Sequence, residues 1–231
     1  MSQPLISIVI PVWNPKPGVL DQVLKSIDMQ TYKNLEVIVV NDGGVELPVT
    51  RYPLRITYIN QPHLGAPAAR NNGLRNASGE YVIFWDADVI GNKDMIETLV
   101  GALEKNPSVS FAYCNFYFGW KKMKGQNFNI ERLKDCNYIT STTLIRKKDA
   151  IQWDESLKRF QDWDYFLTLA ELGKQGIWVD EYLFRAITGG TMSTWLPSFV
   201  YKKPWCYLPW FRERVEKYKK AKEVIIRKHS L

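Results

Sequence analysis

The chain has 231 residues, of which 45% are hydrophobic and 24% are charged, a composition typical of a folded domain and not of a disordered protein. Three widely spaced cysteines and only two histidines argue against a disulfide framework or a zinc site, and they favour a reducing, cytosolic compartment. No window reaches the ~18–20 apolar residues of a membrane span, and the first apolar run ends at Pro11, so we expect neither a transmembrane helix nor a signal peptide.

The net charge of +7 is concentrated at the C-terminus. Residues 201–231 contain ten Lys or Arg against three Glu, which accounts for the whole net charge and leaves residues 1–200 neutral. A nucleic-acid-binding domain is expected to be basic over the surface that binds, so we expect no nucleic-acid partner. A basic tail on a neutral body would instead suit an anionic surface.

The first half of the chain alternates between two kinds of pattern. Short apolar, β-branched runs predict buried strands at 5–12, 35–40, 55–60, 81–85 and 109–114. Apolar residues at helical spacing and turn signals predict helices at 19–30, 66–76 and 92–105. This alternation predicts an α/β fold, with a mostly parallel central sheet flanked by helices.

The second half is less regular. Residues 115–135 are aromatic and rich in lysine, and we expect a loop or short hairpin there at the rim of the domain. Weaker patterns predict a strand at 140–146, a helix at 161–172 and short strands at 177–179 and 183–187.

Three polar clusters follow predicted strands directly: Trp13-Asn14, Asp42-Gly43-Gly44 and Asp86-Ala87-Asp88. Ligands of open α/β sheets bind outside the carboxyl ends of the strands, so one crevice can collect all three clusters. The chain contains neither the glycine fingerprint of dinucleotide-binding folds nor that of a P-loop, which removes those two classes of nucleotide site.

Taken in order, four segments and one shorter match resemble a family 2 glycosyltransferase of the GT-A fold. The resemblance covers roughly residues 5–195 and leaves the tail outside it. The segments are Ser7-Ile-Val-Ile-Pro-Val-Trp-Asn14, Glu36-Val-Ile-Val-Val-Asn-Asp-Gly43, Gly65-Ala-Pro-Ala-Ala-Arg-Asn-Asn-Gly73, Ala77-Ser-Gly-Glu-Tyr-Val-Ile-Phe-Trp-Asp-Ala-Asp88 and Gln161-Asp-Trp-Asp164.

This resemblance implies a Rossmann-like GT-A domain over residues 1–195, with a nucleotide-binding half at 1–115, an acceptor half at 116–195 and a helical tail at 196–231. It implies an inverting, metal-dependent transfer of one sugar from a nucleotide-diphospho-sugar, most simply a UDP-sugar. The acceptor would be a saccharide or a lipid-linked saccharide in cell-surface glycan synthesis. The Gln-x-x-Arg-Trp motif of processive synthases is absent, which favours single-sugar transfer.

Asp86 and Asp88 are the predicted metal site. Mn²⁺ or Mg²⁺ prefers carboxylate oxygens together with phosphate oxygens, and a divalent cation can stabilise a departing diphosphate. The resemblance makes Asp88 the firmer metal ligand and places Asp86 near both the metal and the ribose. The structural alternative is a strand-exit turn whose acids cap the following helix.

Four further residues are predicted to bind the nucleotide. The resemblance assigns Asp42 to the N–H groups of the base, Pro11 and Trp13 to the base and ribose pocket, and Arg70 to the nucleotide. The alternatives are a turn closed by the Asp42 side chain and a solvated arginine on a helix face. We expect His63 to be a residue of a surface loop and not a ligand.

Inverting transfer needs a general base for the acceptor hydroxyl. The resemblance assigns this role to Asp162, although Gln161 replaces the usual Glu before it. The alternative for Asp162, as for Asp164, is an acid favoured by the dipole at the start of a helix. Many relatives carry a metal-binding His further on; here Arg185 stands in that region and is predicted to pair with the diphosphate, and loop 188–193 is predicted to fold over the nucleotide.

The tail combines aromatic residues with a predicted helix that begins near Pro209. Its apolar stripe consists of Phe211, Val215, Tyr218, Ala221 and Ile225. The stripe either lies in a membrane interface or packs on the body or on a second copy of the chain. We therefore expect a cytoplasmic protein, free or at the inner face of the membrane. Two rival functions are a glycan- or membrane-binding module on a decayed enzyme scaffold and a sugar-phosphate nucleotidyltransferase.

Overall fold

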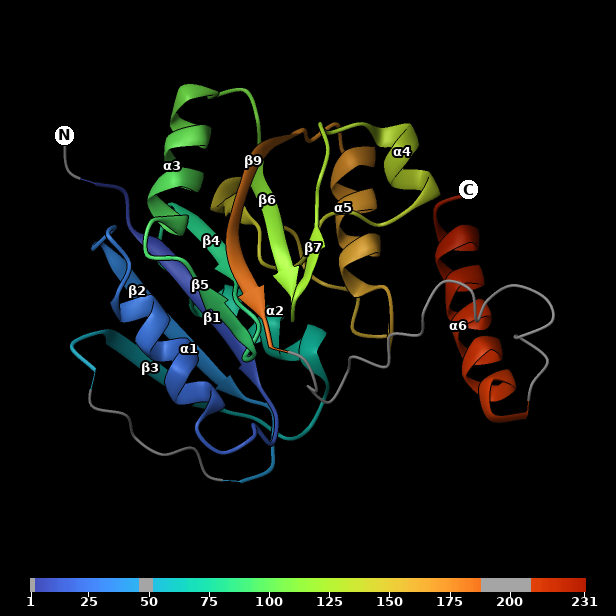
Figure 1. Cartoon of the computed structure of the whole chain (residues 1–231), viewed down its shortest axis with the longest axis horizontal. Helices are drawn as coiled ribbons and strands as arrows, with labels where there is room; N and C mark the ends of the chain where they lie inside the picture. Colours follow the sequence, from blue (N-terminus) through green and yellow to red (C-terminus); the bar gives the residue numbers. More distant parts are fainter. Residues whose placement is uncertain (1–2, 46–51, 188–208) are drawn as a thin grey trace.

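The computed structural model describes residues 3–45, 52–187 and 209–231, and its centre is one curled sheet flanked by helices (Figure 1). The strand order is β3-β2-β1-β4-β8-β6-β9-β5, with β7 paired to β6. The strands are β1 (Ile6–Val12), β2 (Leu35–Asn41), β3 (Arg55–Asn60), β4 (Tyr81–Phe84), β5 (Val89–Gly91), β6 (Phe111–Phe118), β7 (Lys121–Met123), β8 (Leu144–Arg146) and β9 (Gly176–Ala186). The helices are α1 (Val19–Asp28), α2 (Ala66–Asn76), α3 (Met95–Lys105), α4 (Ile130–Asp135), α5 (Gln161–Glu171) and α6 (Pro209–Lys228), with a 3-10 turn at Lys147–Asp149.

The N-terminal strands form the parallel part of the sheet, as predicted. Strand β1 pairs in parallel with β2 and β4, and β2 pairs in parallel with β3. The buried, β-branched sequences of β1 and β2 suit strands that are covered on both faces. Their carboxyl ends therefore meet at one edge of the sheet.

The C-terminal strands form a mixed sheet. Strand β8 runs antiparallel to both β4 and β6, whereas β9 is parallel to β6 and antiparallel to β5. The two short strands predicted at 177–179 and 183–187 are one continuous strand, β9, and the register irregularities in its pairing with β6 explain why its pattern looked broken. The predicted boundary at residue 115 lies within β6, so both predicted halves share one sheet.

Two hydrophobic clusters fill the two faces of the sheet. The first cluster contains the buried faces of α1 and α3, and the second contains residues of α2, α4 and α5 together with Ile225 of α6. Burying an aliphatic side chain contributes about 1.5–3 kcal/mol relative to leaving it exposed. The sheet is thus fixed from both sides, which gives the loops at its carboxyl edge a rigid base.

The opposite, amino-terminal edge of the sheet is tied by a buried carboxylate. Glu36 Oε1 accepts hydrogen bonds from Ser7 Oγ at 2.6 Å and from the Ser78 N–H at 2.7 Å. Burial raises the pKa of Glu36, but these hydrogen bonds outweigh it and the net pKa is lowered. Two of the segments that carry the family resemblance therefore meet here for a structural reason.

Helix α6 packs partly against the second hydrophobic cluster. Val215 and Ile225 of the predicted stripe are buried, and the Tyr218 ring lies edge-on to Phe160 with centroids 5.1 Å apart. Packing on the body is therefore realised for this part of the stripe, while the side chain of Phe211 and residues 188–208 lie outside the described residues. Contact with a membrane or a second copy stays a prediction. None of the helices in the described ranges is long and apolar enough to cross a membrane.

Candidate active site

The three predicted polar clusters converge at the carboxyl edge of the sheet. Val12 of β1 is in register with Asn41 of β2, and the Asp42 N–H donates to the Val12 carbonyl at 2.8 Å. On the other side of β1, the Trp85 N–H donates to the Val9 carbonyl at 2.8 Å, which brings the end of β4 level with them. Pro11 and Trp13 at the end of β1 thus lie between the acidic residues that follow β2 and β4.

The buried carboxylate of Asp42 anchors the segment that precedes α2. Its Oδ1 accepts hydrogen bonds from the Gln61 amide at 2.8 Å and the Leu64 N–H at 2.9 Å, and its Oδ2 accepts from the Gly65 N–H at 2.9 Å. Gly65 has a φ of +97°, a conformation that residues with a Cβ rarely adopt. Asp42 therefore has a structural role here, but its hydrogen bonds tie it to residues 61–65, whereas the alternative raised for it was a turn closed within Asp42-Gly43-Gly44.

His63 completes the environment of Asp42. Its Nδ1 lies 2.9 Å from Asp42 Oδ2, and its ring stacks on Trp13 with centroids 4.6 Å apart. Trp13 is 42% exposed and the His63 side chain 54% exposed, so the pair forms an open aromatic surface. His63 is in a surface loop, as expected, but it belongs to the site. The sequence offered no signal for this, because the stack joins residues 50 positions apart.

Arg70 and Ser141 hold Asp86. Arg70 Nη2 donates to Asp86 Oδ1 and Ser141 Oγ donates to Asp86 Oδ2, both at 2.8 Å. The Arg70 guanidinium also lies over the Trp153 ring, 4.6 Å from its centroid, and its side chain is 6% exposed. The alternative of a solvated helix-face arginine is therefore wrong. Ser141 and Trp153 carried no sequence signal, and they join the site through tertiary packing.

Asp88, two residues after Asp86, has a different electrostatic environment. Burial, and secondly repulsion from Asp86, raise the pKa of Asp88 to about 6. Its main chain is fixed, because the Ile187 N–H donates to the Asp88 carbonyl at 2.8 Å. Within the described ranges no group of three or more His, Cys, Asp or Glu side chains could hold a metal alone. A buried Asp88 carboxylate with Asp86 beside it fits a divalent cation that takes its remaining ligands from phosphates.

Asp162 lies in the first turn of α5. Burial raises its pKa; the Arg70 charge opposes this shift and the Asp86 charge adds to it, so the three groups share one electrostatic environment. The neighbouring Gln161 accepts a hydrogen bond from Arg70 Nη1 at 3.1 Å and donates to the Leu157 carbonyl at 3.0 Å. Gln161 therefore couples the start of α5 to the arginine that holds Asp86.

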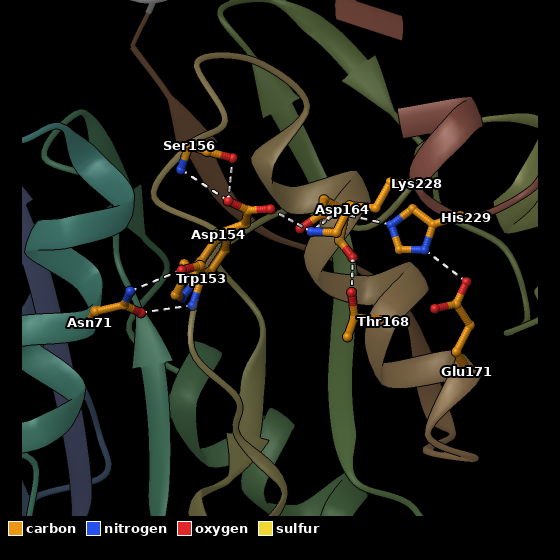
Figure 2. A network of polar contacts seen from close by, with 9 residues as sticks. All are labelled: Asn71, Trp153, Asp154, Ser156, Asp164, Thr168, Glu171, Lys228 and His229. Atoms are coloured by element: carbon orange, nitrogen blue, oxygen red, sulfur yellow. Dashed lines mark hydrogen bonds and ion pairs between the residues drawn. The ribbon is translucent and has the colours of Figure 1, made fainter. Parts of the chain in front are cut away.

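The second acid of α5, Asp164, contacts two residues next to the C-terminus (Figure 2). Its Oδ1 lies 2.7 Å from Lys228 Nζ and 2.9 Å from His229 Nε2. His229 Nδ1 lies 2.7 Å from Glu171 Oε1, and the His229 side chain is 1% exposed. Both ring nitrogens of His229 thus lie within hydrogen-bond distance of a carboxylate oxygen.

The same contacts extend to α2 (Figure 2). Lys228 Nζ donates to Asp154 Oδ2 at 2.6 Å, and the adjacent Trp153 exchanges two hydrogen bonds with the Asn71 side chain. This clamp (Asn71, Trp153, Asp154, Asp164, Glu171, Lys228 and His229) thus joins α2, loop 151–160, α5 and the end of α6.

Arg185 of β9 is engaged elsewhere. Its guanidinium donates to the Gly119 carbonyl and lies over the rings of Tyr117 and Trp120, at 4.6 and 5.3 Å from their centroids. Arg185 is thus held at the β6–β7 turn, and its pairing with a diphosphate stays a prediction. Loop 188–193 lies outside the described residues.

Comparison with known proteins gives relatives of one kind. Residues 7–159 match the model of Glycosyl transferase family 2, which leaves α5 and α6 outside the matched segment. Glycosyltransferase GlyA of Streptococcus pneumoniae serotype 4 is 43% identical over 100 residues, 41% of this chain and 14% of its own length. An uncharacterized glycosyltransferase of Haemophilus influenzae is 29% identical over 198 residues, 77% of this chain and 76% of its own. The chain thus spans only a small part of some curated relatives it matches.

Solved structures agree in fold. TarS 1–349 of S. aureus in complex with UDP-GlcNAc has a TM-score of 0.71 at 20% identity, covering 84% of this chain and 62% of TarS. The mannosyltransferase PcManGT of Pyrobaculum calidifontis, in complex with GDP-Man and Mn²⁺, has a TM-score of 0.62 at 17% identity, covering 84% of this chain and 59% of its own. The predicted GT-A fold is therefore confirmed, and the chain belongs to glycosyl transferase family 2.

Proposed function

We propose that the chain is an inverting transferase that moves one sugar from a nucleotide-diphospho-sugar, with UDP favoured, to a saccharide or lipid-linked acceptor of cell-surface glycan synthesis. The observation that carries this proposal is that Arg70 pairs with Asp86 at one edge of the sheet, and that the Asp86 charge raises the pKa of both Asp88 and Asp162. A strand end and a helix start thus contribute acids to one electrostatic environment. Such an arrangement suits donor binding on one side and proton abstraction on the other.

The nucleotide would lie at the Trp13 side of this edge. The exposed stack of Trp13 and His63 offers an aromatic surface for a base, and Pro11 lies beside it at the end of β1. Asp42 Oδ2 would accept from a base N–H in place of His63, because its present partners already occupy both oxygens. The UDP-GlcNAc and GDP-Man complexes of structurally similar proteins support a nucleotide-sugar ligand.

Asp88, with Asp86 beside it, would hold Mn²⁺ or Mg²⁺. A bound cation would neutralise the diphosphate leaving group and the acidic pair together. The Mn²⁺ in the mannosyltransferase neighbour supports this choice of cofactor. The raised pKa of Asp88 supports it independently, since a cation relieves the repulsion between two neighbouring carboxylates.

Asp162 would act as the general base. It would take the proton of the acceptor hydroxyl while that oxygen attacks the anomeric carbon in line with the departing diphosphate, which inverts the configuration. Its raised pKa keeps it closer to the working pH than an ordinary aspartate. The other acid in the first turn of α5, Asp164, is paired with Lys228 and contacts His229, so it is not available for this role.

The test is release of nucleotide from a panel of UDP-Glc, UDP-Gal, UDP-GlcNAc and GDP-Man with Mn²⁺, with and without candidate saccharide acceptors. We expect turnover of at least one donor, loss of turnover with EDTA, and a product whose anomeric configuration is opposite to that of the donor. Binding of UDP without release from any donor would favour a decayed, non-catalytic scaffold. A product of retained configuration would contradict the role given to Asp162.

A further inference from the structure

Aromatic rings and cations alternate on one face of β6, β7 and β9. We call this set the aromatic–cation ladder; it consists of Tyr117, Trp120, Lys122, Tyr182 and Arg185. The Arg185 guanidinium lies over Tyr117 and Trp120, and Lys122 Nζ lies 5.4 Å from the Tyr182 ring centroid. Tyr117 and Tyr182 lie 4.8 Å apart between centroids, so the contacts form one continuous surface.

The ladder lies beside the candidate active site. Strand β6 is antiparallel to β8, which is antiparallel to β4, so β6 ends at the same edge as Asp86 and Asp88. The Gly119 N–H at the hairpin donates to the Ala186 carbonyl at 3.0 Å, and the next residue, Ile187, donates its N–H to the Asp88 carbonyl. Figure 1 shows the β6–β7 hairpin and the end of β9 pointing to this edge.

Packing does not account for the residue at the tip. Trp120 is 94% exposed, so its indole contributes almost no buried apolar surface to folding. Its ring is nevertheless placed against Arg185, whose guanidinium is fixed by the Gly119 carbonyl. An exposed indole next to a cation is typical of a surface that binds a ligand.

The charge of the ladder is not neutralised from within. Among the residues that the structure describes, neither Lys122 nor Arg185 forms an ion pair with a carboxylate. The nearby Lys124 does, with Nζ 3.1 Å from Asp180 Oδ2. Two cations therefore remain available to an anionic partner, and three aromatic rings between and beside them offer faces to apolar surface.

We propose that the aromatic–cation ladder binds the acceptor, and that the acceptor is a saccharide that carries carboxylate or phosphate groups. The C–H faces of a sugar ring pack on aromatic rings, and acidic substituents pair with Lys122 and Arg185, so that Arg185 serves the acceptor in place of the diphosphate predicted from the sequence. A neutral glycan would leave both cations without a partner. The identification of the bound saccharide as the acceptor rests on the proposed function, whereas binding of the saccharide itself needs no donor.

The experiment measures binding of two anionic probes, polygalacturonate and a phosphomannan, by affinity gel electrophoresis of the full chain. Their matched neutral forms are methyl-esterified polygalacturonate and dephosphorylated mannan. We expect at least one anionic probe to bind about tenfold more tightly than its neutral form, with weakening at higher salt. Trp120→Ala and Lys122→Ala should each weaken that binding several-fold. Lys124→Ala, the matched control in an existing ion pair, should leave it unchanged.

Three outcomes would overturn the proposal: equal binding of the neutral and acidic forms, binding indifferent to Trp120 and Lys122, or loss of binding only when the basic residues Lys219 and Lys220 of α6 are changed to Ala. Flotation with anionic vesicles that depends on Trp120, without saccharide binding, would assign the ladder to a lipid surface and overturn it too. Thermal melts of each variant exclude misfolding. Failure of the donor panel alone would remove the proposed function but leave this binding site standing, so the two failures are distinguishable.

Discussion

The molecule contains two groups of acidic residues, and helix α5 contributes to both. In the clamp, Asp154 and Asp164 lie 2.6 and 2.7 Å from Lys228 Nζ, and Glu171 lies 2.7 Å from His229 Nδ1. At the carboxyl edge of the sheet, Asp88 and Asp162 have raised pKa values because burial is not offset by a close ion pair. The first arrangement stabilises the fold, whereas the second costs free energy unless a ligand binds.

The pKa values of Asp154 and Asp88 reflect this difference. A hydrogen bond from Lys228 is the main cause that lowers the pKa of Asp154 to about 2. Burial is the main cause that raises the pKa of Asp88 to about 6. Neighbouring residues on one helix, Asp162 and Asp164, thus belong to opposite groups, and their electrostatic partners decide which is structural.

The largest effect is expected from the pair of variants on α5. Asp162→Asn removes the proposed base with little change of shape, so kcat for transfer should fall about 10²–10⁴-fold. Asp164→Asn should keep kcat within a few-fold of wild type but lower the stability, because it weakens the ion pairs to Lys228 and His229. Initial rates give kcat, and urea unfolding gives the stability, of both variants.

The UDP affinity of Asp162→Asn serves as its control and should match that of wild type. If Asp164→Asn instead abolished turnover while folding normally, the assignment of the two acids would be reversed. The ion-paired acid would then be the catalytic one, and pairing would not mark an acid as structural.

A second large effect is expected at the buried end of the clamp. His229→Ala leaves the Asp164 and Glu171 carboxylates without one partner each, so the free energy of unfolding should fall by about 3 kcal/mol. Arg227→Ala, at the exposed neighbouring position, is the matched control and should change little. Urea denaturation at pH 7 measures both. An equal, small effect of the two changes would mean that the clamp does not hold α6 on the body.

Much of the fold was predictable because its signals are local. The β-branched runs of β1 and β2 and the apolar periodicity of α1 located these elements closely. Short elements such as β5 and α4 were missed, since three to six residues carry too little pattern. Strand β9 was split in two, because its irregular pairing with β6 breaks the alternation of buried and exposed residues.

In the candidate site, too, only the residues with a local sequence signal were predictable. Asp42, Asp86 and Asp88 follow strand ends, where the sequence marks them as site residues. The partners that decide their state are distant in sequence: Ser141 is 55 positions from Asp86, and Gln161 is 91 from Arg70. No local pattern encodes such contacts, so the burial of Arg70 and the clamp on Asp164 could be found only in the structure.

The next effect separates the groups by pH, in the presence of EDTA. The pKa of Asp88 rises from 3.8 to about 6 on folding, so between pH 4 and 6 the native state binds more protons, and stability falls as pH rises through that window. Asp88→Asn removes this cost. At pH 8 the free energy of unfolding of the variant should therefore exceed that of wild type by about 2 kcal/mol, after allowance for partial exposure of the side chain. At pH 4 the two free energies should be equal. A constant difference at every pH would refute the assignment.

The smallest effect concerns the residue that departs from the family pattern. Gln161 accepts from Arg70 as a neutral group, so the guanidinium charge remains shared between Asp86 and Asp162. In Gln161→Glu a second carboxylate would take part of that charge and add its own repulsion, which should raise the pKa of Asp162. The acidic limb of kcat/KM should then move up by about 0.5–1 pH unit, equivalent to about 1 kcal/mol. Gln161→Met, which removes the contact without adding charge, is the control for geometry. A downward shift in Gln161→Glu would mean that Arg70 does not couple the two acids.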